Sequence, residues 1–179
     1  MCRLCRTGES PLRVLIHNNG SLFHYLCGKN PGKLGWIVGP RAFRQHRFQP
    51  WIEYALDNDA YSSHNNGDEW DEPAFYEMLD AAKMNLIKPL WVVIPDVVGD
   101  REATIRKWEA HHKRVREYGW PLAFAVQDGM NKDDVPHDAD VVFVGGSDTQ
   151  NWKWRNAHYW CEHFQRVHIG RVNSVRRVQ

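Results

Sequence analysis

The chain has 179 residues and a formal net charge of +1, which suits one domain, or most of one, with a substantial core. No apolar stretch approaches the roughly 20 residues that span a bilayer, and Met1-Cys2-Arg3 opens no signal peptide, so we expect no membrane role. The near-neutral net charge does not favour strong electrostatic attraction to nucleic acid. The charges are nevertheless unevenly distributed: acidic residues cluster in residues 57–80, and basic residues cluster in residues 101–116 and 166–177.

Short apolar runs bounded by turn residues predict the strands. In chain order they cover residues 12–16, 36–38 (a short strand or edge piece), 51–56, 90–94, 122–126, 141–144 and 167–169. Predicted helices cover residues 72–84, 101–118 and 154–165, and Asn173-Ser174 could cap one more. Residues 28–35 and 62–70 are predicted loops, and residues 131–138 a polar connection or short helix.

Strand and helix alternate from about residue 50 onward, a pattern typical of a parallel sheet with right-handed crossovers. We therefore predict an α/β fold, a parallel TIM-barrel-like domain over residues 1–179. About six strands are counted, whereas a closed barrel has eight units and typically about 250 residues. The sheet is incomplete, or the chain is part of a longer parent, or the fold is an open α/β sheet.

The cysteines and tryptophans each allow two interpretations. Cys2 and Cys5 have the spacing of half a zinc site, but Cys27 and Cys161 form no second pair. We expect reduced, structural cysteines in a cytoplasmic protein, with zinc as the alternative. The nine tryptophans are core and rim filler or, alternatively, stack on bases. We expect His111-His112 at the surface.

Polar residues close four of the apolar runs: Asp57, Asp96, Gln127 and Gly145-Gly146. In a barrel of parallel strands the carboxyl ends converge, and active sites lie there. These residues are therefore candidates for a single pocket. Glycines would let backbone amides approach a ligand closely.

At these positions the sequence resembles the tRNA-guanine transglycosylase family, and more closely its short phage and bacterial relatives that insert 7-deazaguanines into DNA. The resemblance runs from about residue 54 to 172. The family's D-S-G-G-[FY]-Q motif is similar to Asp57-Asn58-Asp59-Ala60-Tyr61-Ser62, and its later acidic residue corresponds to Asp96. Its V-Q-G-G motif is similar to Val126-Gln127-Asp128-Gly129, and its G-G-L-A-V-G motif to Val144-Gly145-Gly146-Ser147. Its M-G-V-G motif is similar to His168-Ile169-Gly170-Arg171.

The resemblance implies a role for each residue. Asp57 would be the general acid and base, and Tyr61 would stack on the purine. Asp96 would accept hydrogen bonds from the purine N1–H and exocyclic amine, and Gln127 would meet the O6 edge. Gly145, Gly146, His168 and Gly170 would complete the substrate site. The structural alternatives are a turn residue for Asp57, rim packing for Tyr61, a helix-entry turn for Asp96, a loop brace for Gln127 and tight turns for the glycines.

In the family, a nucleophilic aspartate and a zinc site follow the M-G-V-G segment, and this sequence stops at Gln179, before both. Asp57 or Asp59 is then the substitute nucleophile. We expect exchange of guanine for a 7-deazaguanine in nucleic acid, DNA rather than tRNA, without a cofactor. A base glycosylase and a non-catalytic purine-binding protein are the alternatives, and a homo-oligomer is compatible with the sequence. Arg171, Arg176 and Arg177 are suited to phosphate.

Overall fold

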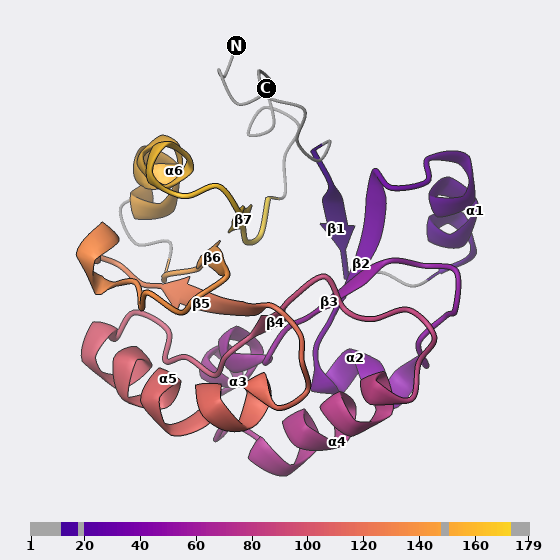
Figure 1. Ribbon diagram of the computed structural model, residues 1–179, viewed down its shortest axis with the longest axis horizontal. Coiled ribbons are helices and arrows are strands. Elements are labelled where there is room, and N and C mark those ends of the chain that lie inside the picture. Colours follow the sequence, from indigo (N-terminus) through magenta and orange to yellow (C-terminus); the bar gives the residue numbers. More distant parts are fainter. Residues whose placement is uncertain (1–11, 18–19, 148–150, 173–179) are drawn as a thin grey trace.

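The computed structural model describes residues 12–17, 20–147 and 151–172. Seven strands form one sheet in the order β1 to β7, and every neighbouring pair is parallel. The strands lie along an arc, with helices along its outer side (Figure 1). The protein is thus an α/β protein with a curled, all-parallel sheet.

Strands and helices alternate along the described chain, except that two helices follow the third strand. The strands are β1 (Val14–Ile16), β2 (Leu34–Val38), β3 (Tyr54–Leu56), β4 (Val92–Val93), β5 (Leu122–Val126), β6 (Val141–Val144) and β7 (Val167–Ile169). The helices are α1 (Ser21–Lys29), α2 (Pro40–Gln45), α3 (Ala60–Asn66), α4 (Glu72–Lys83), α5 (Arg101–Arg116) and α6 (Trp152–His163), with a 3-10 turn, η2 (Lys132–Asp134).

Strand burial explains the apolar runs in the sequence. All five residues of β5 are buried, because one face packs on the helices and the other faces the inside of the curl. The outer core joins residues such as Val38, Leu56 and Phe124 to the helices. The inner core is separate and holds Ile37, Ala55, Trp91, Val93, Ala123, Ala125 and Val141, with Leu15, Leu90 and Phe143 packed against it.

Aspartates begin helices α4 and α5. Asp71 accepts a hydrogen bond from Ala74 N at the start of α4, and Asp100 accepts one from Ala103 N at the start of α5. Each carboxylate satisfies a backbone donor that the first helical turn leaves without a partner. These starts match the predicted helices at residues 72 and 101.

The sequence undercounted the elements. The described residues contain seven strands rather than about six, and β2 is an interior strand between β1 and β3 rather than an edge piece. Alternation starts at β1 rather than near residue 50. Helices α1, α2 and α3 were missed, and α1 and α3 cover parts of the predicted loops 28–35 and 62–70. The predicted cap at Asn173-Ser174 lies outside the described residues.

The prediction of two surface histidines is wrong for His111. Its side chain is 8% exposed and its Nδ1 lies 3.0 Å from the hydroxyl of Tyr76. Burial lowers the pKa of His111, which keeps the imidazole neutral. His112 is half-buried and stacks on Trp108. Both histidines of α5 therefore pack against other side chains of the protein.

Five tryptophans are core residues, and one, Trp51, is 64% exposed. The buried ones are Trp36, Trp91, Trp108, Trp120 and Trp160. Core filling therefore explains most of this residue type among the described residues. No helix in the described part of the chain is long and apolar enough to cross a bilayer.

Candidate active site at the carboxyl ends of the strands

Because all seven strands run in the same direction, the residues that follow them gather at one edge of the curled sheet. We call this edge the carboxyl-end rim; it comprises His17, Gly39, Asp57, Asp96, Gln127, Gly145, Gly170 and Arg171, with the turns beside them. The rim collects carboxylates, amides and cations from distant parts of the chain.

Asn58 is the centre of the polar network at this rim. It is 1% exposed, and its Nδ2 donates to Ile94 O at 2.9 Å and to Asp96 Oδ1 at 2.8 Å. Its Oδ1 accepts from Ala60 N at 2.7 Å, at the first residue of α3. One side-chain amide therefore fixes the start of α3 and joins the end of β3 to that of β4.

Asp96 accepts a hydrogen bond from a second side-chain amide, that of Gln127. Gln127 Nε2 donates to Asp96 Oδ2 at 2.7 Å, so each carboxylate oxygen already has one amide partner. Burial raises the pKa of Asp96, and the hydrogen bonds from Asn58 and Gln127 oppose that shift. The backbone N–H of Asp96 is a further donor to this carboxylate.

Gln127 is fully buried, and both ends of its amide are engaged. Its Oε1 accepts from Gly99 N at 3.0 Å, in addition to the bond from Nε2 to Asp96. Its backbone N–H donates to Met130 Sδ. The geometry makes Gln127 a brace for Asp96.

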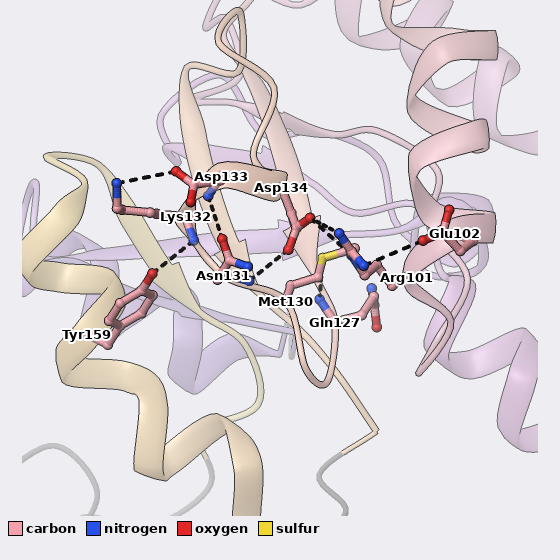
Figure 2. Close-up of polar contacts among 9 residues, drawn as sticks. All are labelled: Arg101, Glu102, Gln127, Met130, Asn131, Lys132, Asp133, Asp134 and Tyr159. Atoms are coloured by element: carbon pink, nitrogen blue, oxygen red, sulfur yellow. Dashed lines mark hydrogen bonds and ion pairs between the residues drawn. The ribbon is translucent and has the colours of Figure 1, made fainter.

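Polar contacts fix the loop after β5, which begins at Gln127 (Figure 2). Asn131 and Asp134 form reciprocal caps around η2. Arg101 of α5 pairs with Asp134, and Lys132 N donates to the hydroxyl of Tyr159 in α6 at 2.9 Å. The loop is thereby tied to helices on both of its sides.

Asp57 is the second acid of the rim. Its backbone N–H bonds to Val38 O and its Oδ1 accepts from Asn58 N at 2.8 Å. Burial raises the pKa of Asp57; the charge of Asp96 adds to the shift, and His17 opposes it. A carboxyl group with a raised pKa is suited to proton transfer near neutral pH.

Asp59 has a left-handed backbone, with a φ of 60°, and its Oδ2 accepts from Arg41 N at 2.8 Å. Burial and the charge of Asp57 raise the pKa of Asp59. A Cβ on Gly39 would lie 2.1 Å from Asp59 Oδ1, so only glycine leaves room for this carboxylate. Asp59 also lines a cavity of about 280 Å³ between α2 and the start of α4.

Tyr61 and Arg171 meet across the rim. The Arg171 guanidinium carbon lies 3.6 Å from the centre of the Tyr61 ring, and Arg171 Nη2 donates to Gly146 O at 3.0 Å. Tyr61 is 36% exposed. One face of the predicted stacking ring is thus covered by a guanidinium group.

The glycines of the rim have structural tasks. Gly145 N donates to Val126 O, so that amide belongs to the sheet. Gly146 has a φ of 77°, a conformation that favours glycine. A Cβ on Gly170 would lie 2.9 Å from the Phe143 ring, and the Gly170 carbonyl accepts from Lys153 Nζ at 3.1 Å.

His168 lies on the inner face of the curl. Its ring stacks on Phe143 with centroids 5.2 Å apart and lies 5.0 Å from the Trp91 ring. Burial, with the nearby charges of His17 and Lys153, lowers the pKa of His168 to about 4. The imidazole is therefore neutral at physiological pH.

The structure brings Asp96 and Gln127 into direct contact, with Asp57 near enough for its charge to act on Asp96. Tyr61 and Gly146 lie together at the Arg171 side chain. The roles of all these residues, and of His168 and Gly170, remain predictions. Cys2 and Cys5 lie outside the described residues, and the residues described include no group of three or more metal-ligating side chains.

Sequence reasoning gave no role to Asn58, His17 or Lys153. The run Asp57-Asn58-Asp59 drew attention to its acids, yet the amide between them makes the connections. His17 stood out only as part of a turn, and Lys153 had no signal, because its burial (1% exposed) depends on tertiary packing.

Comparison with family models, curated proteins and solved structures finds no match for this chain. The fold and the rim therefore define only a class: an α/β protein with a curled seven-stranded parallel sheet and paired carboxylates at the strand ends.

Proposed function

We propose that this protein is a guanine transglycosylase-like enzyme built on a partial TIM-like barrel, exchanging guanine for a 7-deazaguanine in nucleic acid, with DNA favoured over tRNA. The observation that carries the proposal is the carboxylate pair at the rim. Asp57 and Asp96 follow adjacent strands, burial raises the pKa of Asp57, and Asp96 is oriented by two amides whose hydrogen bonds favour its ionised form.

Asp96 would recognise the base. The N1–H and the exocyclic amine of guanine are two adjacent donors, and an ionised carboxylate accepts both. Adenine has an acceptor at N1, so Asp96 would reject it. Gln127 would act by holding Asp96, and it would reach the O6 edge only if its own bonds rearranged.

Asp57 would carry the chemistry. Breaking the bond between C1′ and the base passes through an oxocarbenium-like state, while the bonding electrons leave with the base. A protonated Asp57 would give its proton to the departing base, and the carboxylate so formed would stabilise the sugar cation or bond to it. Asp59 is tied to the first turn of α2, which makes Asp57 the better candidate of the two.

A base glycosylase is the second candidate. The pKa of Asp59 is raised too, but its Oδ2 is engaged by Arg41 N, so Asp57 would be the acid that acts. A single acid suits a reaction in which water, rather than a second base, reacts at C1′.

The test uses DNA that carries labelled guanine. The proposal predicts release of guanine when a 7-deazaguanine base is supplied, with the new base retained in the DNA. Release without retention would favour the glycosylase. No release from DNA or tRNA, with guanine still bound, would leave a binding protein and contradict both enzymatic candidates.

A further inference from the structure

The charges at the rim are divided between its two sides. Asp57, Asp59 and Asp96 follow β3 and β4, whereas Arg171 and Lys153 lie beside the ends of β6 and β7. Lys153 is buried, at 1% exposed, so Arg171 is the cation of this side that a ligand can reach. A ligand that spans the rim would therefore meet acids at one end and the Arg171 guanidinium at the other.

Arg171 is held in a defined position on the cationic side. Its backbone is left-handed, with a φ of 56°, which is uncommon for a residue with a side chain. Its guanidinium carbon lies 3.6 Å from the centre of the Tyr61 ring, and its Nη2 donates to Gly146 O. The cation–π contact and one hydrogen bond thus hold the group in place.

A guanidinium has five N–H donors. One bond to Gly146 O leaves others for a ligand, and a planar fork of donors matches two oxygens of a phosphate. Arg171 is half-buried, so it remains accessible from the rim. Because its position is already fixed, little side-chain entropy is lost when an anion binds.

We infer that Arg171, held in place by Tyr61 and Gly146, binds a phosphate group of the substrate. The ligand class is a nucleotide within a nucleic acid, with its base toward Asp96 and its phosphate toward the ends of β6 and β7. This inference rests on the proposed function for the identity of the base. The phosphate contact itself follows from the geometry of Arg171.

The experiment compares Arg171→Gln and Arg171→Lys with wild type. Binding of a fluorescein-labelled single-stranded DNA oligonucleotide containing guanine is measured by anisotropy over a range of salt concentrations, and binding of free guanine by calorimetry. Arg166→Gln is the matched control, since Arg166 precedes β7 at the opposite edge of the sheet and its guanidinium donates to Leu90 O rather than to a residue of the rim.

For Arg171→Gln we expect oligonucleotide affinity to fall about 10-fold and the slope of log K against log salt to become shallower by about 0.7, the value for one phosphate contact on a single strand. Arg171→Lys should keep the slope and lose part of the affinity, since it keeps the charge without the fork. Free guanine should bind all variants equally, and Arg166→Gln should behave as wild type.

An unchanged salt slope in Arg171→Gln would overturn the inference, as would wild-type protein that binds no oligonucleotide. Equal loss of free guanine and oligonucleotide binding would overturn it too, because Arg171 would then act on the base or the fold. If wild type binds no guanine but Arg171→Gln still makes the slope of log K against log salt shallower, the phosphate contact at Arg171 is supported and the proposed function is contradicted.

Discussion

The substitution Asn58→Asp tests the polar network most severely. It exchanges an amide donor for a carboxylate oxygen of nearly the same shape, at a distance of 2.8 Å from Asp96 Oδ1. It also replaces the donor to Ile94 O. Two charges at that separation repel by about 6 kcal/mol at an effective dielectric constant of about 20.

The protein can relieve this repulsion by binding a proton. Forcing a carboxyl group with an ordinary pKa of 3.8 to stay protonated at pH 7.5 costs about 5 kcal/mol, at about 1.4 kcal/mol per pH unit. We therefore expect Asn58→Asp to lower the free energy of unfolding by about 4 to 6 kcal/mol at pH 7.5, which is comparable to the whole stability of many domains.

The pH dependence has a fixed sign. Each carboxyl group of the pair would have a folded-state pKa above its unfolded value, so its destabilising effect is absent below the unfolded pKa and grows as the pH rises through the folded pKa. At pH 4.5 the expected loss is about 2 kcal/mol or less, because one proton shared between the two groups replaces the missing amide donor.

The assay is urea unfolding followed by tryptophan fluorescence at both pH values. Asn65→Asp is the control: it makes the same change on the exposed side of α3 and should shift stability by a few tenths of a kcal/mol. A loss for Asn58→Asp below about 1 kcal/mol at pH 7.5, or an equal loss at both pH values, would refute the described contact between Asn58 and Asp96.

Three further outcomes follow from the structure. Asp57→Ala should keep the fold and abolish base exchange, as measured by release of labelled guanine, and a fully active variant would remove Asp57 from the mechanism. Gly39→Ala should cost about 1 to 3 kcal/mol in thermal or urea unfolding, because the new Cβ displaces Asp59 and breaks its hydrogen bond; Gly28→Ala, with no atom within 4 Å of its Cβ, should not destabilise. The imidazole of His168 should titrate by NMR near pH 4, and a midpoint near 6.5 would contradict its placement in the inner core.

The sequence predicted the main strands and the proximity of the strand-end residues for the same reason. Strands buried on both faces, such as β5, read as continuous apolar runs, and parallel strands place their carboxyl ends together. Finding Asp96 and Gln127 in contact required only that their strands be neighbours in the sheet, which short right-handed crossovers favour.

The missed helices lacked local signals. The N-cap residues of α1 and α3, Gly20 and Asp59, make no side-chain hydrogen bond to the first turn, and α2 has only six residues. Helix α3 buries only Ala60 and Ser63, so its sequence shows no apolar stripe. Such helices are stabilised by tertiary contacts rather than by propensity.

The role of Asn58 was also out of reach. Its bonds depend on the register of β3 against β4, in which Leu56 pairs with Val92, and on the left-handed turn at Asp59. Likewise, Gln127 looked available to a ligand until the structure showed its amide engaged by Asp96 and Gly99. Side-chain partners of this kind are set by three-dimensional packing.

The central claim is that Asp96, held by Asn58 and Gln127, reads the donor edge of guanine. Calorimetric titration of free guanine into wild type and into Asp96→Asn tests it directly, with adenine as the comparison ligand. The account predicts guanine binding by wild type, none for adenine, and at least a 100-fold loss in the folded variant, since two charge-assisted hydrogen bonds contribute about 3 kcal/mol or more. Equal affinity of wild type and Asp96→Asn for guanine would contradict it.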